Sequence, residues 1–141
     1  MGTNDTNLPT NCLNNNEAIQ YLASVVASLR LGTYTAVTGS PTLTAAQMVG
    51  GVVEISGGAA ATVTTDTAAN IITRMTALDA NAGAGSTATF RLINDNSGTL
   101  TITAGTGVTA VGTGSASIAA GVSRGYIIKI LTTTTVSVTA A

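Results

Sequence analysis

The chain has 141 residues, of which only 8% are charged, with a formal net charge of -1 and no histidine. Aromatic residues make up 3%, so the basic surface and the aromatic platforms that hold nucleic acids are both missing. A hydrophobic fraction of 45% excludes a disordered chain, because enough apolar surface is available to offset the entropy of ordering. The composition predicts a folded domain that does not bind nucleic acid.

Such a low charge also has consequences for the surface, which must be rich in threonine, alanine and glycine. Few charges give little protection against association, so we expect copies of the chain or a partner to cover much of this surface. The uncharged stretches are interrupted by Gly, Thr and Pro and never reach the ~20 predominantly apolar residues that a bilayer span requires. The sequence predicts a soluble intracellular product without a membrane span or a secretory signal.

The first 40 residues are predicted to form a separate segment, with a boundary near Ser40-Pro41 that leaves residues 41–141 as the main domain. Residues 1–16 form a polar, Asn-rich arm, and residues 17–30 show one apolar helical stripe. The stripe consists of Ile19, Leu22, Val26 and Leu29. Because an isolated helix this short is marginal in water, the stripe needs a partner. Its own domain, a self-associating bundle and another protein remain open, and these four residues are the candidate interface.

Beyond Pro41 the pattern changes to short strands separated by turns. A helix is expected from Ala68 to Leu78, capped by Asp66 or Thr67. The other expected elements are a helical turn at residues 44–48 and strands at 52–55, 62–65, 88–93, 100–103, 108–111, 115–119, 126–131 and 135–139.

Two of these strands are expected to form a hairpin, because residues 94–98 read Asn-Asp-Asn-Ser-Gly between the strands at 88–93 and 100–103. The strand at 126–131 is apolar on both faces apart from Lys129, which predicts a central position. The predicted fold is mainly β: an antiparallel β-sandwich or jelly roll with one short inserted helix and an N-terminal arm plus helix.

No combination of residues supports catalysis. The commonest general base, histidine, is absent, and the six acidic residues are scattered singly. Cys12 is the only cysteine and has no Cys/His cluster for a metal. The glycine-rich loop at residues 83–87 lacks a lysine for phosphate and precedes a strand instead of a helix. The sequence predicts a non-enzymatic protein without a metal or cofactor.

Two alternative interpretations are less favoured. A β-solenoid would explain the similar segments at residues 105–107 and 112–114, but the similarity does not continue at a fixed period. Thr99, Thr101 and Thr103 line one face of one strand, as in ice-binding proteins, but one ladder is not a plane.

Four segments resemble small virion proteins of tailed bacteriophages, the capsid decoration (cement) proteins with a jelly-roll body. They are LTAAQMVGG at residues 43–51, TDTAANII at 65–72, FRLIN at 90–94 and TITAGTGV at 101–108. The resemblance covers roughly residues 41–141, and a module of a head or tail fibre that binds a host receptor would fit the same segments. It implies a homotrimer, made in the bacterial cytoplasm, that binds the outer capsid surface where major capsid protein subunits meet. Residues 1–40 lie outside the resemblance, and we expect them to clamp neighbouring subunits or the capsid.

Overall fold

The computed structural model describes residues 18–20, 22, 32–111 and 116–141. The chain separates into two compact units, Met1–Gly32 and Thr33–Ala141. In the first unit, residues 18–20 and 22 are helical, within the range predicted for the N-terminal helix. Strand β1 (Tyr34–Thr38) belongs to the second unit. The structure therefore divides the chain before this strand and not near Ser40-Pro41.

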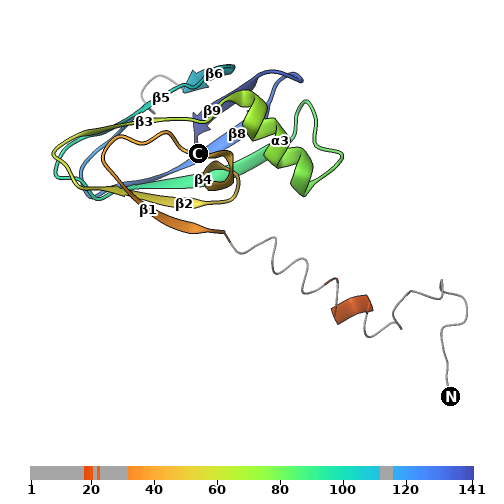
Figure 1. Ribbon diagram of the computed structural model, residues 1–141, viewed down its shortest axis with the longest axis horizontal. Helices are drawn as coiled ribbons and strands as arrows, with labels where there is room; N and C mark the ends of the chain where they lie inside the picture. Colours follow the sequence, from red (N-terminus) through yellow and green to blue (C-terminus); the bar gives the residue numbers. More distant parts are fainter. Residues whose placement is uncertain (1–17, 21, 23–31, 112–115) are drawn as a thin grey trace, which may run out of the picture. The chain divides into compact units, whose positions relative to one another are not determined.

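The second unit is mainly β and contains two mixed sheets (Figure 1). The six-stranded sheet has the order β1, β2 (Val52–Ser56), β4 (Thr87–Asn94), β8 (Ser123–Ile130), β9 (Val136–Ala140) and β6 (Val108–Val111). The three-stranded sheet has the order β3 (Ala61–Thr64), β5 (Leu100–Thr103) and β7 (Ser117–Ile118). The predicted central position of β8 is confirmed. The predicted antiparallel arrangement is wrong for the pairs β1–β2, β2–β4, β3–β5 and β6–β9, which are parallel.

The parallel pairs arise because the chain forms arches, in which consecutive strands lie in different sheets. β2 leads to β3 through residues 57–60, and β4 leads to β5 through residues 95–99. β2 pairs with β4 in one sheet while β3 pairs with β5 in the other, so the second arch follows the path of the first. The predicted hairpin between β4 and β5 is therefore wrong, because the turn carries the chain from one sheet to the other.

A shorter arch precedes these two, and a reversed arch follows them. β1 pairs in parallel with β2, and Thr42 bridges Thr64 in parallel, so residues 34–42 stack on the β2–β3 arch. β7 and β8 run in the opposite direction and pair antiparallel with β5 and β4. Several of these turns gather at one end of the unit, at the left in Figure 1. The connectivity is thus a stack of arches, and a jelly roll is not confirmed.

Both sheets contribute side chains to one hydrophobic core. Burial alternates along the strands, as in β2, where Val53 and Ile55 are fully buried and their neighbours are partly exposed. Phe90 and Tyr126 lie on adjacent strands, and their rings stack with centroids 5.2 Å apart. The stacked pair thus lies on β4 and β8, the two middle strands of the six-stranded sheet.

Two helices follow the first two arches, and threonine begins each of them. Thr44 caps α2 (Ala45–Met48) in a capping box with Gln47, and Thr67 caps α3 (Ala68–Leu78), as predicted for the second helix. Asp66 joins the two helix starts, because its carboxylate accepts hydrogen bonds from the backbone N–H of Ala45 at 2.6 Å and of Thr67 at 2.7 Å.

The turn of the β4–β5 arch is fastened by two buried asparagines, Asn94 and Asn96. The Asn94 amide donates to the carbonyl oxygens of Gly98, at 2.8 Å, and Ile118, at 2.9 Å. The Asn96 carbonyl oxygen accepts from the backbone N–H of Gly58 at 2.9 Å. The two side chains thereby connect three arches at the point where the chain changes sheets.

Candidate functional site

Three acidic side chains of the second unit accept hydrogen bonds: Asp66 at the two helix starts, Asp79 in a turn and Glu54 from a tyrosine on the neighbouring strand. Besides Asp66, the Asp79 carboxylate accepts from the backbone N–H of Asn81 at 2.9 Å, and the Glu54 carboxylate accepts from the hydroxyl of Tyr34. Among the described residues, no three His, Cys, Asp or Glu side chains gather as they would around a metal ion. The described helices include none that is long and apolar enough to cross a membrane. The second unit also presents the faces of its two sheets, which are described in turn below.

One such surface is the outer face of the six-stranded sheet, which we define by two rows of side chains across β1, β2, β4 and β8. The first row is Tyr34, Val52, Arg91 and Gly125, and the second is Ala36, Glu54, Ile93 and Ser123. Val52 and Ile93 are half-buried, whereas 59% of Tyr34 is exposed. The outer face thus combines accessible aliphatic and aromatic groups with one cation and one carboxylate.

Two hydrogen bonds orient the long side chains of the outer face. The Tyr34 hydroxyl donates to Oε2 of Glu54 at 2.6 Å, and this bond is the main reason that the pKa of Tyr34 is raised above its ordinary value. Nη1 of Arg91 donates to Oγ of Ser123 at 2.7 Å. The side chains of Tyr34 and Arg91 therefore reach from the first row to the second. Neither the Tyr34 hydroxyl nor the bonded Nη1 of Arg91 lies over the backbone of Gly125.

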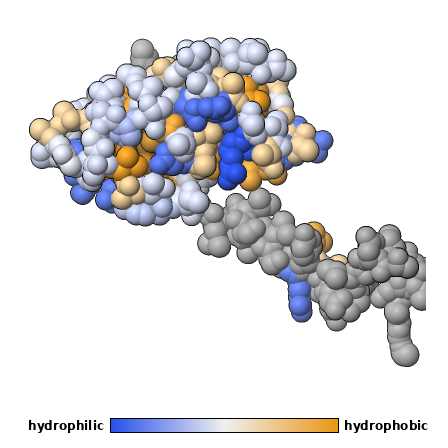
Figure 2. All heavy atoms as spheres, viewed as in Figure 1, coloured by the Kyte–Doolittle hydropathy of each residue, from blue (hydrophilic) through white to orange (hydrophobic). Residues whose placement is uncertain are grey.

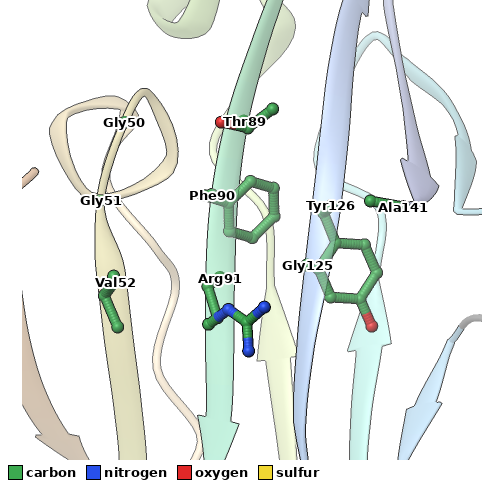
Figure 3. A pocket seen from close by; sticks show the side chains of 9 residues that line it. All are labelled: Gly50, Gly51, Val52, Thr89, Phe90, Arg91, Gly125, Tyr126 and Ala141. Atoms are coloured by element: carbon green, nitrogen blue, oxygen red, sulfur yellow. The ribbon is translucent and has the colours of Figure 1, made fainter. Parts of the chain in front are cut away.

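A pocket of about 260 Å³ lies at that place (Figure 3). Val52, Arg91 and Gly125 border it from three neighbouring strands, β2, β4 and β8. The full lining is Gly50, Gly51, Val52, Thr89, Phe90, Arg91, Gly125, Tyr126 and Ala141. No Asp or Glu side chain is among these residues. The pocket is therefore a small, open site with a single cationic side chain.

Tyr126 borders this pocket, but its ring is buried in the core against Phe90. Burial raises the pKa of Tyr126, and the nearby Arg124 opposes the rise. The two stacked, buried rings form a rigid support for the strands around the pocket.

A second surface is the outer face of the three-stranded sheet, which carries rows of hydroxyl groups. One row is Thr42, Thr64 and Thr103, and the other is Thr62, Thr101 and Ser117. The hydroxyl oxygens of Thr64 and Thr103 lie 3.1 Å apart and bond to each other. Thr101 and Thr103, which the sequence predicted on one face of a single strand, thus belong to two rows of hydroxyl groups that cross several strands. Ice binding by these rows stays an untested alternative.

The predicted interface residues of the N-terminal helix are described in part. Ile19 is 64% exposed and Leu22 is 60% exposed, and both are in helical conformation. Val26 and Leu29 lie outside the described residues. The role of these four residues as an interface stays a prediction.

Sequence reasoning did not single out Tyr34, Arg91 or Gly125 as site residues. Two signals were present in the sequence. Residues 34–38 are rich in β-branched and aromatic residues and lie between two glycines, and Gly125 interrupts an otherwise regular strand. Comparison of the chain with protein-family models, with curated proteins and with solved structures gave no match. The function is therefore argued from the surfaces of this chain.

Proposed function

We propose that this chain is a structural virion protein, a capsid decoration (cement) protein that binds the outer capsid surface as a homotrimer and stabilises the shell. The observation that carries the proposal is the outer face of the six-stranded sheet, where half-buried Val52 and Ile93 accompany few charges. Figure 2 shows the same character over the visible side of the second unit, where most residues are near neutral in hydropathy. Such a surface favours association with protein rather than with nucleic acid.

The body suits a structural role because its two sheets share one core and its arches are stacked. In this proposal the sheets act as a two-layer sandwich that presents a rigid surface without a cofactor, a metal or a membrane anchor. A standard protein interface buries about 1,600 Å² and reaches useful affinity without catalysis. Repetition of such contacts with major capsid protein over a symmetric shell adds avidity.

The N-terminal helix is proposed to add a second contact, through Ile19 and Leu22. Burial of an aliphatic side chain contributes about 1.5–3 kcal/mol, so we expect the double variant Ile19→Ser/Leu22→Ser to weaken trimer or capsid association about 100-fold or more. Val122→Ser is the matched control, because Val122 is also exposed, at 42%, but lies in the second unit. Equal association of both variants, measured by sedimentation and capsid binding, would remove the helix from the proposal.

The decisive experiment adds the purified chain to undecorated capsids of the phage that encodes it. We expect saturable binding at high copy number and an increase in the temperature at which the capsids open. A fibre module, the alternative function, would bind at a few sites per particle and would also bind host cells. Absence of binding to capsids together with binding to cells would replace the decoration function by the fibre function.

A further inference from the structure

Gly125 lies inside the central strand β8, where glycine ordinarily weakens a strand. The backbone does not require it: Gly125 has no positive φ, and an added Cβ would meet only the Cβ of Ala141, at an ordinary 3.6 Å. The other pocket glycines differ, since Gly50 has a φ of +83° and a Cβ on Gly51 would lie 2.1 Å from a backbone oxygen. Glycine inside a strand often marks a bulge, a tight bend or a site where a ligand or another backbone approaches closely. The register of β8 with β4 is unbroken at Gly125, which excludes a bulge there.

The space above Gly125 is bordered by a cation. Arg91 is the direct cross-strand partner of Gly125, and its side chain is exposed on the same face. A guanidinium has five N–H donors, and the bond to Ser123 uses one of them. Thr89, also exposed, adds a hydroxyl to the lining. With about 260 Å³, the pocket is much larger than the ~30 Å³ that one water occupies in the liquid.

We propose that this pocket binds the carboxylate of an acidic side chain on a partner protein. The planar guanidinium of Arg91 recognises a carboxylate through paired hydrogen bonds, and the glycine, valine and alanine residues of the lining match the methylene stem of a glutamate. A sugar acid matches less well, because its several hydroxyls would find only two exposed polar side chains in the lining, Thr89 and Arg91, and buried unpaired hydroxyls reduce affinity. The proposal does not rest on capsid decoration, since a fibre module with this pocket would bind an acidic side chain in the same way.

The test is an NMR titration of the full chain with N-acetyl-glutamate amide, using N-acetyl-glutamine amide as the neutral probe of the same shape. A ligand this small is expected to bind with a dissociation constant of about 1–10 mM. The expected result is a set of shift changes at Val52, Arg91 and Gly125 with the glutamate probe, and at least tenfold weaker binding of the glutamine probe.

Three variants assign the binding to the pocket. Gly125→Val is expected to fill it, because the added Cβ would meet only the Cβ of Ala141 at an ordinary distance. This variant is expected to abolish binding while the thermal midpoint stays the same or rises. Arg91→Gln is expected to weaken binding at least tenfold, whereas Lys129→Gln, which removes an exposed cation elsewhere on β8, is expected to change it less than about twofold. No binding of the glutamate probe, equal binding of both probes, or equal effects of the Arg91 and Lys129 variants would overturn the proposal.

Discussion

The side chain of Asn94 joins separate parts of the second unit, and its replacement by alanine is expected to destabilise that unit strongly. Asn94 is fully buried. Its amide donates to the carbonyl oxygens of Gly98 and Ile118, and its carbonyl oxygen accepts from the backbone N–H and the amide of Asn96 at 3.1 and 3.0 Å. Asn94→Ala removes all four bonds at once and leaves their partners in the core.

The size of the effect follows from the number of bonds. A buried hydrogen bond contributes about 1 kcal/mol net, and an orphaned buried group costs about 1–3 kcal/mol. A water molecule that enters the vacated space would restore part of this loss. We therefore expect the free energy of unfolding to fall by about 3–4 kcal/mol, which corresponds to a decrease of roughly 10–15 °C in the thermal midpoint.

The assay is equilibrium unfolding in urea, followed by circular dichroism at one protein concentration for all variants, since association also changes apparent stability. Asn81→Ala is the matched control, because Asn81 lies exposed in a loop, and it is expected to change stability by less than about 0.5 kcal/mol. Asn94→Asp tests the donors separately. It keeps the shape but presents acceptors to the Gly98 and Ile118 oxygens, so it should destabilise at least as much as Asn94→Ala.

Unfolding of Asn94→Ala at the same urea concentration as Asn81→Ala would contradict a stabilising role of the Asn94 side chain. Retention of the parent chain's stability by Asn94→Asp would contradict it as well, because the amide donors would then contribute nothing. In either case the arches would have to be stabilised by the apolar core alone.

Two further predictions follow from the geometry of the turns and the outer face. Gly98→Ala places a Cβ 1.6 Å from the carbonyl oxygen of Ala59 and should prevent the arches from stacking, which would be measured as a loss of cooperative unfolding. Gly83→Ala is the control: its Cβ would have no contact closer than 3.9 Å, so it should leave stability unchanged. The raised pKa of Tyr34 means that the stability due to its bond with Glu54 is present below the ordinary tyrosine pKa of about 10 and is lost as the pH rises through the raised value. Glu54→Gln should therefore lower the pKa of Tyr34, measured by NMR titration of the tyrosine ring. An unchanged pKa would contradict the assignment of the bond.

Local structure in this chain could be predicted from the sequence because it depends on nearby residues. The spacing of Ala68, Ile71 and Met75 and the cap at Thr67 predicted α3, which begins and ends at the expected residues. Strand β8 was placed at the centre because its residues are apolar on both faces. Each of these patterns extends over about ten consecutive residues, so the element can be predicted without knowing which distant residues it contacts.

Strand pairing could not be predicted in the same way, because it depends on distant residues. Residues 94–98 have the composition of a hairpin turn, but Asn94 and Asn96 are buried and bond to other arches, which a hairpin turn in solvent would not allow. The repeated Thr-x-Thr of β3 and β5 marks equivalent positions of two arches. The insertion of α3 and the loop after it makes their spacing irregular and hides the repeat.

The candidate site was missed for a related reason. Gly125 and Arg91 are far apart in the sequence, and a glycine in a strand has no specific meaning until its cross-strand neighbour is known. Tyr34 was assigned to the N-terminal segment, so its strand and its bond to Glu54 were not expected. The composition did predict the general character of the outer face, since a chain with 8% charged residues has few charges to place on any surface.

Sedimentation equilibrium of the full chain over a wide concentration range tests most directly the central claim that the low-charge surface is an association surface. We expect a single species near three times 13.8 kDa, with a mass that does not change on dilution. A monomer of 13.8 kDa at every concentration would contradict the claim.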